Sequence, residues 1–299
     1  MQRGCRVRLF KEKVIKLLLF GCAALAASVL LGILALLLFY GARAFKEINP
    51  LEFFLGREWN PDAYGEPKYG IIPLLLGSLS TTLIALAIAT PTGIASALFI
   101  SEKLGGRLKM FVKTLVEILA GFPSVVIGFF GLTVLSPVIA RVFNIYSGLN
   151  LLNGGILLGI MALPTIISIS EDALEAVPLS YREAALALGA DSWRASVKVV
   201  LPAARPGILA ALMLGFGRAI GETMAVLMVA GNAPVIPLSP FDPVRTITST
   251  IAIELGEVPF GTIHFHALFA LGLFLFAISL GTNLIAESML KREKERFQI

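Results

Sequence analysis

Residues 17–40 read LLLFGCAALAASVLLGILALLLFY, a run of 24 positions without a charged side chain. A helix needs about 20 apolar residues to cross the ~30 Å hydrocarbon core of a bilayer, because each residue advances it by about 1.5 Å. This run is long enough, and it predicts a membrane-spanning helix near the N-terminus.

Five more apolar blocks follow along the 299-residue chain, at residues 71–100, 115–140, 154–170, 207–230 and 267–290. Pro91, Pro123 and Pro164 lie inside three of them, and membrane helices tolerate proline where neighbouring groups satisfy the freed carbonyls. The chain is 57% apolar and only 15% charged, with a mean hydropathy of +0.85, whereas a soluble domain carries about 25% charged residues. The sequence therefore predicts an all-α integral membrane protein with six transmembrane helices.

The first block admits a second interpretation, because Ala42-Arg43-Ala44 follows it and resembles the cleavage site of a signal peptide. The apolar region of a signal peptide is usually about 7–15 residues long. The block at 17–40 is longer than that. We therefore expect an uncleaved first span.

Basic residues gather at the ends of the apolar blocks. Six lie in residues 1–16, four in 103–113 and four in 291–299, whereas the loops on the other side carry Arg141 and Arg245, apart from the mixed segment 41–70. The positive-inside rule then places both termini in the cytoplasm. The net charge of +5 is thus a signal of membrane topology, and we expect contact with lipid rather than with nucleic acid.

These observations predict the organisation of the chain. Residues 1–16 form a basic cytoplasmic N-terminus, 17–290 a six-span transmembrane domain with a cytoplasmic loop at 171–206, and 291–299 a basic cytoplasmic C-terminus. The exported segment leaves no room for a separate soluble domain. Its aromatic residues fit a belt at the lipid headgroups; they are Trp59, Tyr64 and Tyr69.

The long cytoplasmic loop has a core that reads SYREAALALG at residues 180–189. Ser180 and Glu183 have the spacing of a capping box, in which each side chain satisfies a backbone N–H at the start of a helix. Gly189 supplies a left-handed stop. The sequence therefore predicts a short exposed helix that ends at Gly189, and Asp191 can cap a second helix after it.

A longer pattern extends from this helix: Glu183-Ala184-Ala185, three residues, Gly189, nine residues, then Val199-Val200-Leu201-Pro202. This pattern resembles the EAA signature of binding-protein-dependent ABC importer permeases, with Val199 where isoleucine is usual. It also falls in the cytoplasmic loop where that family has it. The resemblance implies a type I ABC importer permease architecture.

In that family the short helix docks into a groove on an ATPase subunit. The resemblance implies that Ala184 and Ala185 allow close approach, that Glu183 offers a charge to the partner, and that Gly189 permits the turn between the two helices. The chain contains no G-x-x-x-x-G-K-[ST] loop. ATP and its Mg²⁺ are therefore expected on a separate ATPase, and no cofactor or metal is expected in this chain.

The fifth apolar block carries two charged residues, Arg218 and Glu222. We expect Arg218 near the middle of this span and Glu222 one turn away on the same helical face. Each charge at the bilayer centre costs about 2.5–3.5 kcal/mol, so such residues face a protein interior or a polar path. Two interpretations remain open: Glu222 only neutralises Arg218, or Arg218 lends positive potential to an anion pathway while Glu222 holds or releases it. The planar guanidinium suits an oxyanion.

Three further stretches resemble PstC-type phosphate permeases: GRAIGETMAV at 217–226, LAGFPSVV at 119–126 and EWNP at 58–61. The residues after Glu-Thr favour PstC over the homologous PstA, where a proline usually follows soon. The resemblance implies ATP-driven import of inorganic phosphate that an extracytoplasmic binding protein delivers. It also implies a heterodimer with a PstA-type permease on two ATPase subunits, in the cytoplasmic (inner) membrane of a bacterium or archaeon.

The candidate substrate pathway consists of Arg218, Glu222, Thr223 and Ser124. Ser124 follows Pro123, and its hydroxyl is available either to the substrate or to its own backbone, which is the commoner role in membrane helices.

Other functions fit parts of the sequence. A permease for molybdate or sulfate could carry the same EAA loop, although the Arg-Ala-Ile-Gly-Glu-Thr stretch favours phosphate. A passive channel has no use for a docking helix. An intramembrane metalloprotease would need H-E-x-x-H, which the sequence lacks, and the two histidines, His264 and His266, lie near the outer start of the sixth block. We therefore expect a transport subunit rather than an enzyme.

Overall fold

The structure is a computed structural model that describes residues 2–63 and 65–297. The predictions for the two termini and for the aromatic belt extend to Met1, Tyr64, Gln298 and Ile299, which lie outside the described residues. In chain order, the elements are α1 (Gln2–Ala44), α2 (Pro50–Leu55), β1 (Trp59–Asn60), β2 (Lys68–Tyr69), α3 (Ile72–Lys103), α4 (Gly106–Ala120), α5 (Ser124–Phe130), the π-helical segment η1 (Gly131–Leu135), α6 (Ser136–Val142), α7 (Leu151–Glu175), α8 (Leu179–Ala187), α9 (Ser192–Ala195), the π-helical segment η2 (Ser196–Val200), α10 (Leu201–Ala203), α11 (Arg205–Ile220), α12 (Met224–Val229), α13 (Ile247–Glu254) and α14 (Ile263–Phe297).

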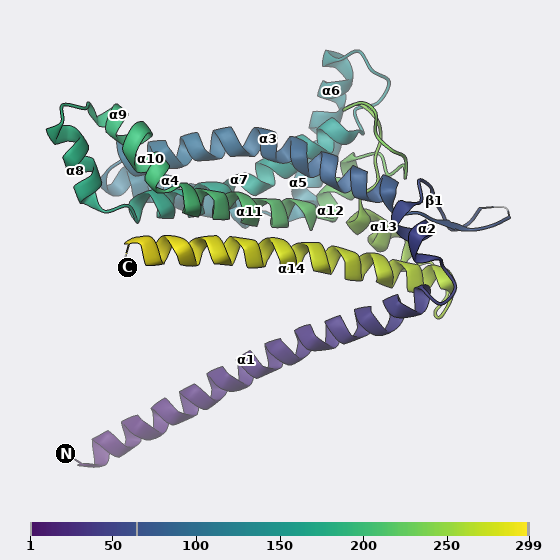
Figure 1. The fold of residues 1–299 in the computed structure, drawn as a ribbon, viewed down its shortest axis with the longest axis horizontal. Helices are drawn as coiled ribbons and strands as arrows, with labels where there is room; N and C mark the ends of the chain where they lie inside the picture. The colour runs from purple at the N-terminus through teal and green to yellow at the C-terminus, as the bar shows by residue number, and fades with distance from the viewer. Residues whose placement is uncertain (1, 64, 298–299) are drawn as a thin grey trace.

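The helices form an elongated bundle (Figure 1). α3, α7 and α11 pack together, and α14 runs along α11. α1 meets α14 at one end of the bundle and diverges from it toward the N-terminus. Both ends of the chain lie at the same end of the bundle as α8, whereas α2, β1 and α13 lie at the opposite end.

Five of the described helices are apolar and long enough to cross a membrane: Ile15–Ala44, Ile72–Lys103, Ser124–Val142, Leu151–Glu175 and Ile263–Lys291. α11 has 16 residues, so by itself it extends over only about 24 Å. The segment Ser192–Ala203 precedes α11 at a bend of 69°, and the two count together as a sixth span. The prediction of an all-α membrane protein is confirmed, with the bent pair that contains α11 as the sixth candidate span.

The predicted third span is not one kinked helix. α4 ends at Ala120, and a new helix begins at Ser124. Pro123 has no N–H to donate, and it disfavours the helical conformation in the residue before it, so the chain leaves the helix there. The prediction of an uninterrupted span at 115–140 is therefore wrong.

The predicted fifth span is broken in a similar way. α11 ends at Ile220 and α12 begins at Met224, so the prediction of one helix over 207–230 is wrong. Pro91 and Pro164, by contrast, lie inside α3 and α7, which continue past them.

α3 and α7 form the most extensively packed helix pair. A Cβ atom on Gly155 would lie 2.4 Å from Cγ2 of Ile84, and one on Gly93 would lie 2.7 Å from Cγ2 of Ile166. Small residues allow membrane helices to approach each other this closely. The pair is therefore a closely fitted frame against which the neighbouring segments are placed.

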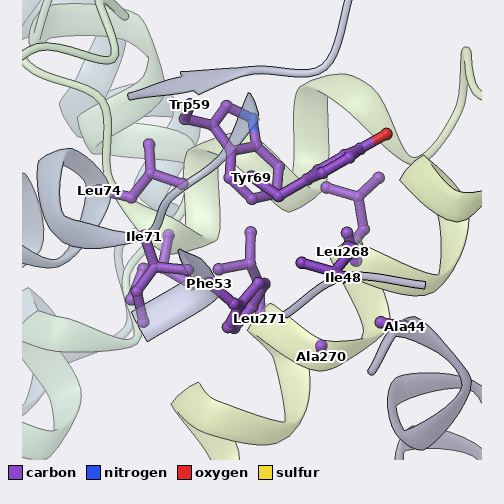
Figure 2. Close-up of a cluster of buried hydrophobic side chains, with 12 residues drawn as sticks. Ala44, Ile48, Phe53, Trp59, Tyr69, Ile71, Leu74, Leu268, Ala270 and Leu271 are labelled. Atoms are coloured by element: carbon purple, nitrogen blue, oxygen red, sulfur yellow. The ribbon is translucent and has the colours of Figure 1, made fainter. Parts of the chain in front are cut away.

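A cluster of buried side chains closes the end of the bundle opposite α8 (Figure 2). Phe53 and Leu74 are fully buried, and Trp59 and Tyr69 lie in the same cluster as Leu268 of α14. The prediction of an aromatic belt at the headgroups is therefore wrong for Trp59 and Tyr69. The segment between α1 and α3 folds back on α3 and α14, which cover these rings.

Glu254 at the end of α13 fixes this arrangement. Nε1 of Trp59 donates to Oε2 of Glu254 at 3.1 Å, and Nη1 of Arg245 donates to Oε1 at 2.8 Å. Nε2 of His264 lies 2.8 Å from Oε2. One carboxylate therefore joins the segment between α1 and α3, the loop before α13 and the first turn of α14.

Candidate substrate pathway and coupling loop

Arg218 lies in the last turn of α11, and its guanidinium connects three helices. Nη1 donates a hydrogen bond to Oγ1 of Thr165 on α7 at 3.0 Å. Nη2 donates to the carbonyl oxygen of Ala120, the last residue of α4, at 3.3 Å. The side chain is otherwise exposed. A cation is thus held in a fixed orientation where α4, α7 and α11 meet, with donors still open to a ligand.

Glu222 lies in the break between α11 and α12. Its carboxylate accepts a hydrogen bond from the N–H of Ala225 at 3.3 Å, and its carbonyl accepts one from Oγ1 of Thr248 at 2.8 Å. Within the described part of the chain, no ion pair joins Glu222 to Arg218. The prediction that the two lie one turn apart on one helical face is wrong, because α11 ends at Ile220, between them, with Gly221 as its C-cap. Glu222 caps α12 instead.

Ser124 and Thr223 lie where the second half of each broken helix begins. Ser124 is the first residue of α5, and Thr223 directly precedes α12. These two helices pack closely, since a Cβ atom on Gly128 would lie 3.0 Å from Cα of Ala225. Oγ1 of Thr223 lies 3.4 Å from the carbonyl oxygen of Gly221, and the Ser124 hydroxyl has no hydrogen-bond partner among the described residues. Both residues are half-buried.

Sequence reasoning misses Thr165 and the carbonyl of Ala120. Thr165 follows Pro164 inside an apolar block, and a hydroxyl beside a helix proline is the only sequence signal for it. In a continuous helix the N–H of Ser124 would bond the Ala120 carbonyl. The break at Pro123 frees that oxygen, and Arg218 takes it as a partner.

The predicted helix in the loop at 171–206, which we call the coupling loop, forms, but it starts at a different residue. α8 begins at Leu179, after Pro178, without a side-chain cap. The predicted capping box of Ser180 and Glu183 is therefore wrong. The predicted helix starts at Tyr181, after Ser180. Pro178 fixes its own φ angle and has no N–H to satisfy, so the chain enters the helix two residues earlier, at Leu179.

The end of α8 agrees with the prediction. Gly189 has a φ angle of +81°, which is the left-handed conformation that favours glycine. Asp191 accepts a hydrogen bond from the N–H of Arg194 at 2.8 Å and so caps α9. The stop at Gly189 and the second cap are confirmed.

The residues of the EAA pattern divide between two sides of α8. Ala185 is buried toward the bundle, whereas Glu183 and Ala184 are exposed. Leu186 and Leu188 add exposed apolar surface, and Leu188 is 89% exposed. Of the two alanines in the pattern, only Ala184 is therefore open to the outside, and Ala185 packs inside.

Residues 89–294 match the family described as "Binding-protein-dependent transport system inner membrane component". The chain belongs to this family. One relative is the "Probable ABC transporter permease protein YqgH" of Bacillus subtilis (strain 168). The two chains are 40% identical over 286 residues, and the match covers 93% of this permease and 91% of YqgH. The phosphate transport system permease protein PstC of Mesorhizobium japonicum is 38% identical over 289 residues, with 90% and 87% of the two chains covered.

Among solved structures, an inward-facing conformation of the MetNI methionine ABC transporter aligns with the permease at a TM-score of 0.52. The two are 20% identical, and the match covers 74% of the permease and 94% of the other chain. This likeness, together with the family match, confirms the predicted importer-permease fold.

Membership of the family defines the role of the chain in general terms. The permease is a multi-pass protein of the inner membrane and a transport subunit rather than an enzyme. Its partners are an ATPase, which supplies the energy, and a binding protein, on which transport depends.

An ion-pair network fixes α4 of the permease to the end of α7 that is near α8. Nζ of Lys113 lies 2.6 Å from Oε2 of Glu171 and 3.0 Å from Oδ1 of Asp172. Lys109 pairs with Glu171 at 2.9 Å and also with Glu175. The hydrogen bond to Glu171 raises the pKa of Lys113 above its ordinary value. The two charged lysines therefore offset most of the negative charge of three carboxylates that lie within 4.8 Å of one another.

Proposed function

We propose that the permease is the membrane-spanning subunit of an ATP-driven importer of inorganic phosphate. The observation that carries the proposal is the Arg218 guanidinium, which Thr165 and the Ala120 carbonyl orient where three helices meet. The name of the related Mesorhizobium japonicum protein, a phosphate transport system permease, supports phosphate as the substrate.

The chemistry of this site suits a tetrahedral oxyanion. The planar guanidinium presents parallel N–H groups that match two oxygens of phosphate. Its charge compensates for the water that the anion loses on entering a low-dielectric interior. The hydroxyls of Ser124 and Thr223 can donate to the remaining oxygens. Glu222 positions Thr223 by capping α12, and it does not neutralise Arg218.

In this proposal, α8 couples phosphate transport to ATP hydrolysis. Glu183 and Ala184 face outward and dock into a groove of a separate ATPase subunit, which binds ATP and Mg²⁺ while the permease holds no cofactor. Gly189 keeps the turn between α8 and α9. Because the loop leads from α7 into α11, closure of the ATPase moves both helices.

The complete complex contains a PstA-type permease as the heterodimeric partner, two ATPase subunits and an extracytoplasmic phosphate-binding protein. Both termini of the permease lie in the cytoplasm together with α8, as the charge distribution predicts. The position of the chain ends and α8 at one end of the bundle supports this orientation (Figure 1).

ATP-dependent uptake of labelled phosphate by vesicles that contain the whole complex tests the proposal, with sulfate and molybdate as competitors. We expect saturable phosphate uptake that neither competitor reduces. Uptake of molybdate or sulfate in its place would assign the permease to another oxyanion. Anion flux that does not require ATP would identify a passive channel and contradict the role of α8.

Thr165→Val is expected to slow phosphate uptake about fivefold, because the guanidinium of Arg218 loses a hydrogen bond worth about 1 kcal/mol. Valine has nearly the shape of threonine, so the packing of α7 is retained. Thr165→Ser keeps a hydroxyl and serves as the matched control, with uptake close to wild type. Equal rates for the valine and serine variants, measured at equal amounts of complex, would show that Thr165 does not orient Arg218.

A further inference from the structure

Glu102 lies in the last turn of α3, and its side chain is only 4% exposed. Its carboxylate accepts a hydrogen bond from Nη2 of Arg182 on α8 and another, at 2.6 Å, from Oγ of Ser196 at the start of η2. One buried carboxylate therefore connects α3 to both halves of the coupling loop, which lie 80 and 94 positions further along the chain.

A carboxylate that is removed from water is stable only where charged or hydrogen-bonding partners compensate for the lost hydration. Arg182 is the cation that supplies this compensation, and the Ser196 hydroxyl adds a second donor. Separating Glu102 from Arg182 would leave a buried charge without its partner, which is far more costly than moving the two together. A displacement of α8 should therefore carry the end of α3 with it.

No covalent link joins the end of α3 directly to the coupling loop, so non-covalent contacts must connect them. α8 and η2 belong to the segment that joins α7 to α11, whereas α3 lies earlier in the chain and is followed by α4. Leu98 of α3 also packs against the loop, in a cluster with Val200 and Ala204. Apolar contacts of this kind are non-directional. The ion pair fixes one position of α3 relative to α8.

We propose that Glu102 is a positioning residue that couples α8 to α3, so that movement of the ATPase reaches α3 as well as α7 and α11. Because α3 is closely fitted to α7, the two helices would then move as one body. This inference rests on the proposed function, since it needs α8 docked on an ATPase.

The test uses the whole complex in vesicles and measures phosphate uptake and ATP hydrolysis in the same sample. For Glu102→Gln we expect ATP hydrolysis to continue while the phosphate transported per ATP falls about tenfold, in the range of site-to-site coupling in proteins. A purely structural role would lower both activities together. Lys103→Gln, which removes the exposed neighbouring charge, is the matched control, with the ratio of wild type.

Arg182→Gln and the double variant with Glu102→Gln complete the experiment. Because the two side chains act as one unit, the double variant should transport no less phosphate per ATP than either single variant. The exchanged pair, Glu102→Arg with Arg182→Glu, should recover part of the ratio. Additive losses, with no recovery in the exchanged pair, would overturn the inference.

Two further outcomes are informative. If the Glu102→Gln complex does not assemble, Ser196→Ala removes only a hydroxyl from the same tether, and an unchanged ratio in that variant would overturn the inference. A wild-type complex without ATP-dependent phosphate uptake would contradict the proposed function. A normal wild-type complex beside an unaffected Glu102→Gln complex would contradict only the role of Glu102.

Discussion

Arg218→Ala should assemble into a normal complex and lose phosphate uptake, with a rate about a hundredfold or more below wild type. Hydrogen bonds to charged groups contribute about 1.5–3 kcal/mol each, and every ~1.4 kcal/mol is a factor of ten, so the loss of two such bonds to the substrate is sufficient. Assembly is retained because the side chain is exposed and its partners, Thr165 and the Ala120 carbonyl, are uncharged.

Two variants separate the contribution of charge from that of geometry. Arg218→Lys keeps the charge and loses the planar fork, so uptake should lie between the alanine variant and wild type. Arg205→Ala removes an exposed arginine at the other end of α11, and it should transport as wild type does. Uptake of labelled phosphate at equal amounts of complex is the measurement. Full uptake by Arg218→Ala would remove Arg218 from the pathway.

The spans could be predicted from the sequence because the thickness of the bilayer fixes the length of an apolar block. The breaks inside two spans could not. Pro123 interrupts its helix while Pro91 and Pro164 do not, although all three lie in apolar blocks. α4 ends with Gly121 as its C-cap, two residues before Pro123, and no glycine lies within the two residues before Pro91 or Pro164. Gly221 ends α11 without any proline, and glycine is common within membrane helices.

The candidate site was also only partly predictable from the sequence. A charge within an apolar block is rare enough to identify Arg218 without a structure. Its contacts with Thr165 and Ala120 depend on the break after α4, and they have no pattern in the sequence. Because the relation between Arg218 and Glu222 was inferred from helical periodicity, it failed where the helix stops.

Local signals in the coupling loop were more reliable than long-range ones. Gly189 and Asp191 were predicted correctly because a left-handed stop and an N-cap depend on a few neighbouring residues. Pro178, just before the predicted capping box, shifted the start of α8. Glu102 and its partners in the loop are 80 and 94 positions apart, so that no periodicity could indicate their contact.

Gly189→Val is expected to uncouple ATP hydrolysis from transport, with phosphate uptake reduced about thirtyfold while the ATPase subunits still hydrolyse ATP. The φ angle of +81° at Gly189 costs a β-branched residue at least about 2 kcal/mol, so the turn between α8 and α9 must change. A Cβ atom at this position would meet no other atom within 4 Å. The effect therefore acts on the direction of the chain and not on packing.

The control variants use the same physical reasoning. Gly189→Asn should keep much of the uptake, because asparagine tolerates the left-handed conformation. Gly105→Val places the same side chain on a glycine that also has open space around it but an extended backbone, with φ of −123°, so coupling should be normal. The measurement is the ratio of phosphate transported to ATP hydrolysed. If Gly189→Val keeps the wild-type ratio, the turn after α8 does not transmit the movement of the ATPase. A loss in Gly105→Val as large as in Gly189→Val would mean that added bulk in the cytoplasmic loops, and not the left-handed backbone, causes the defect.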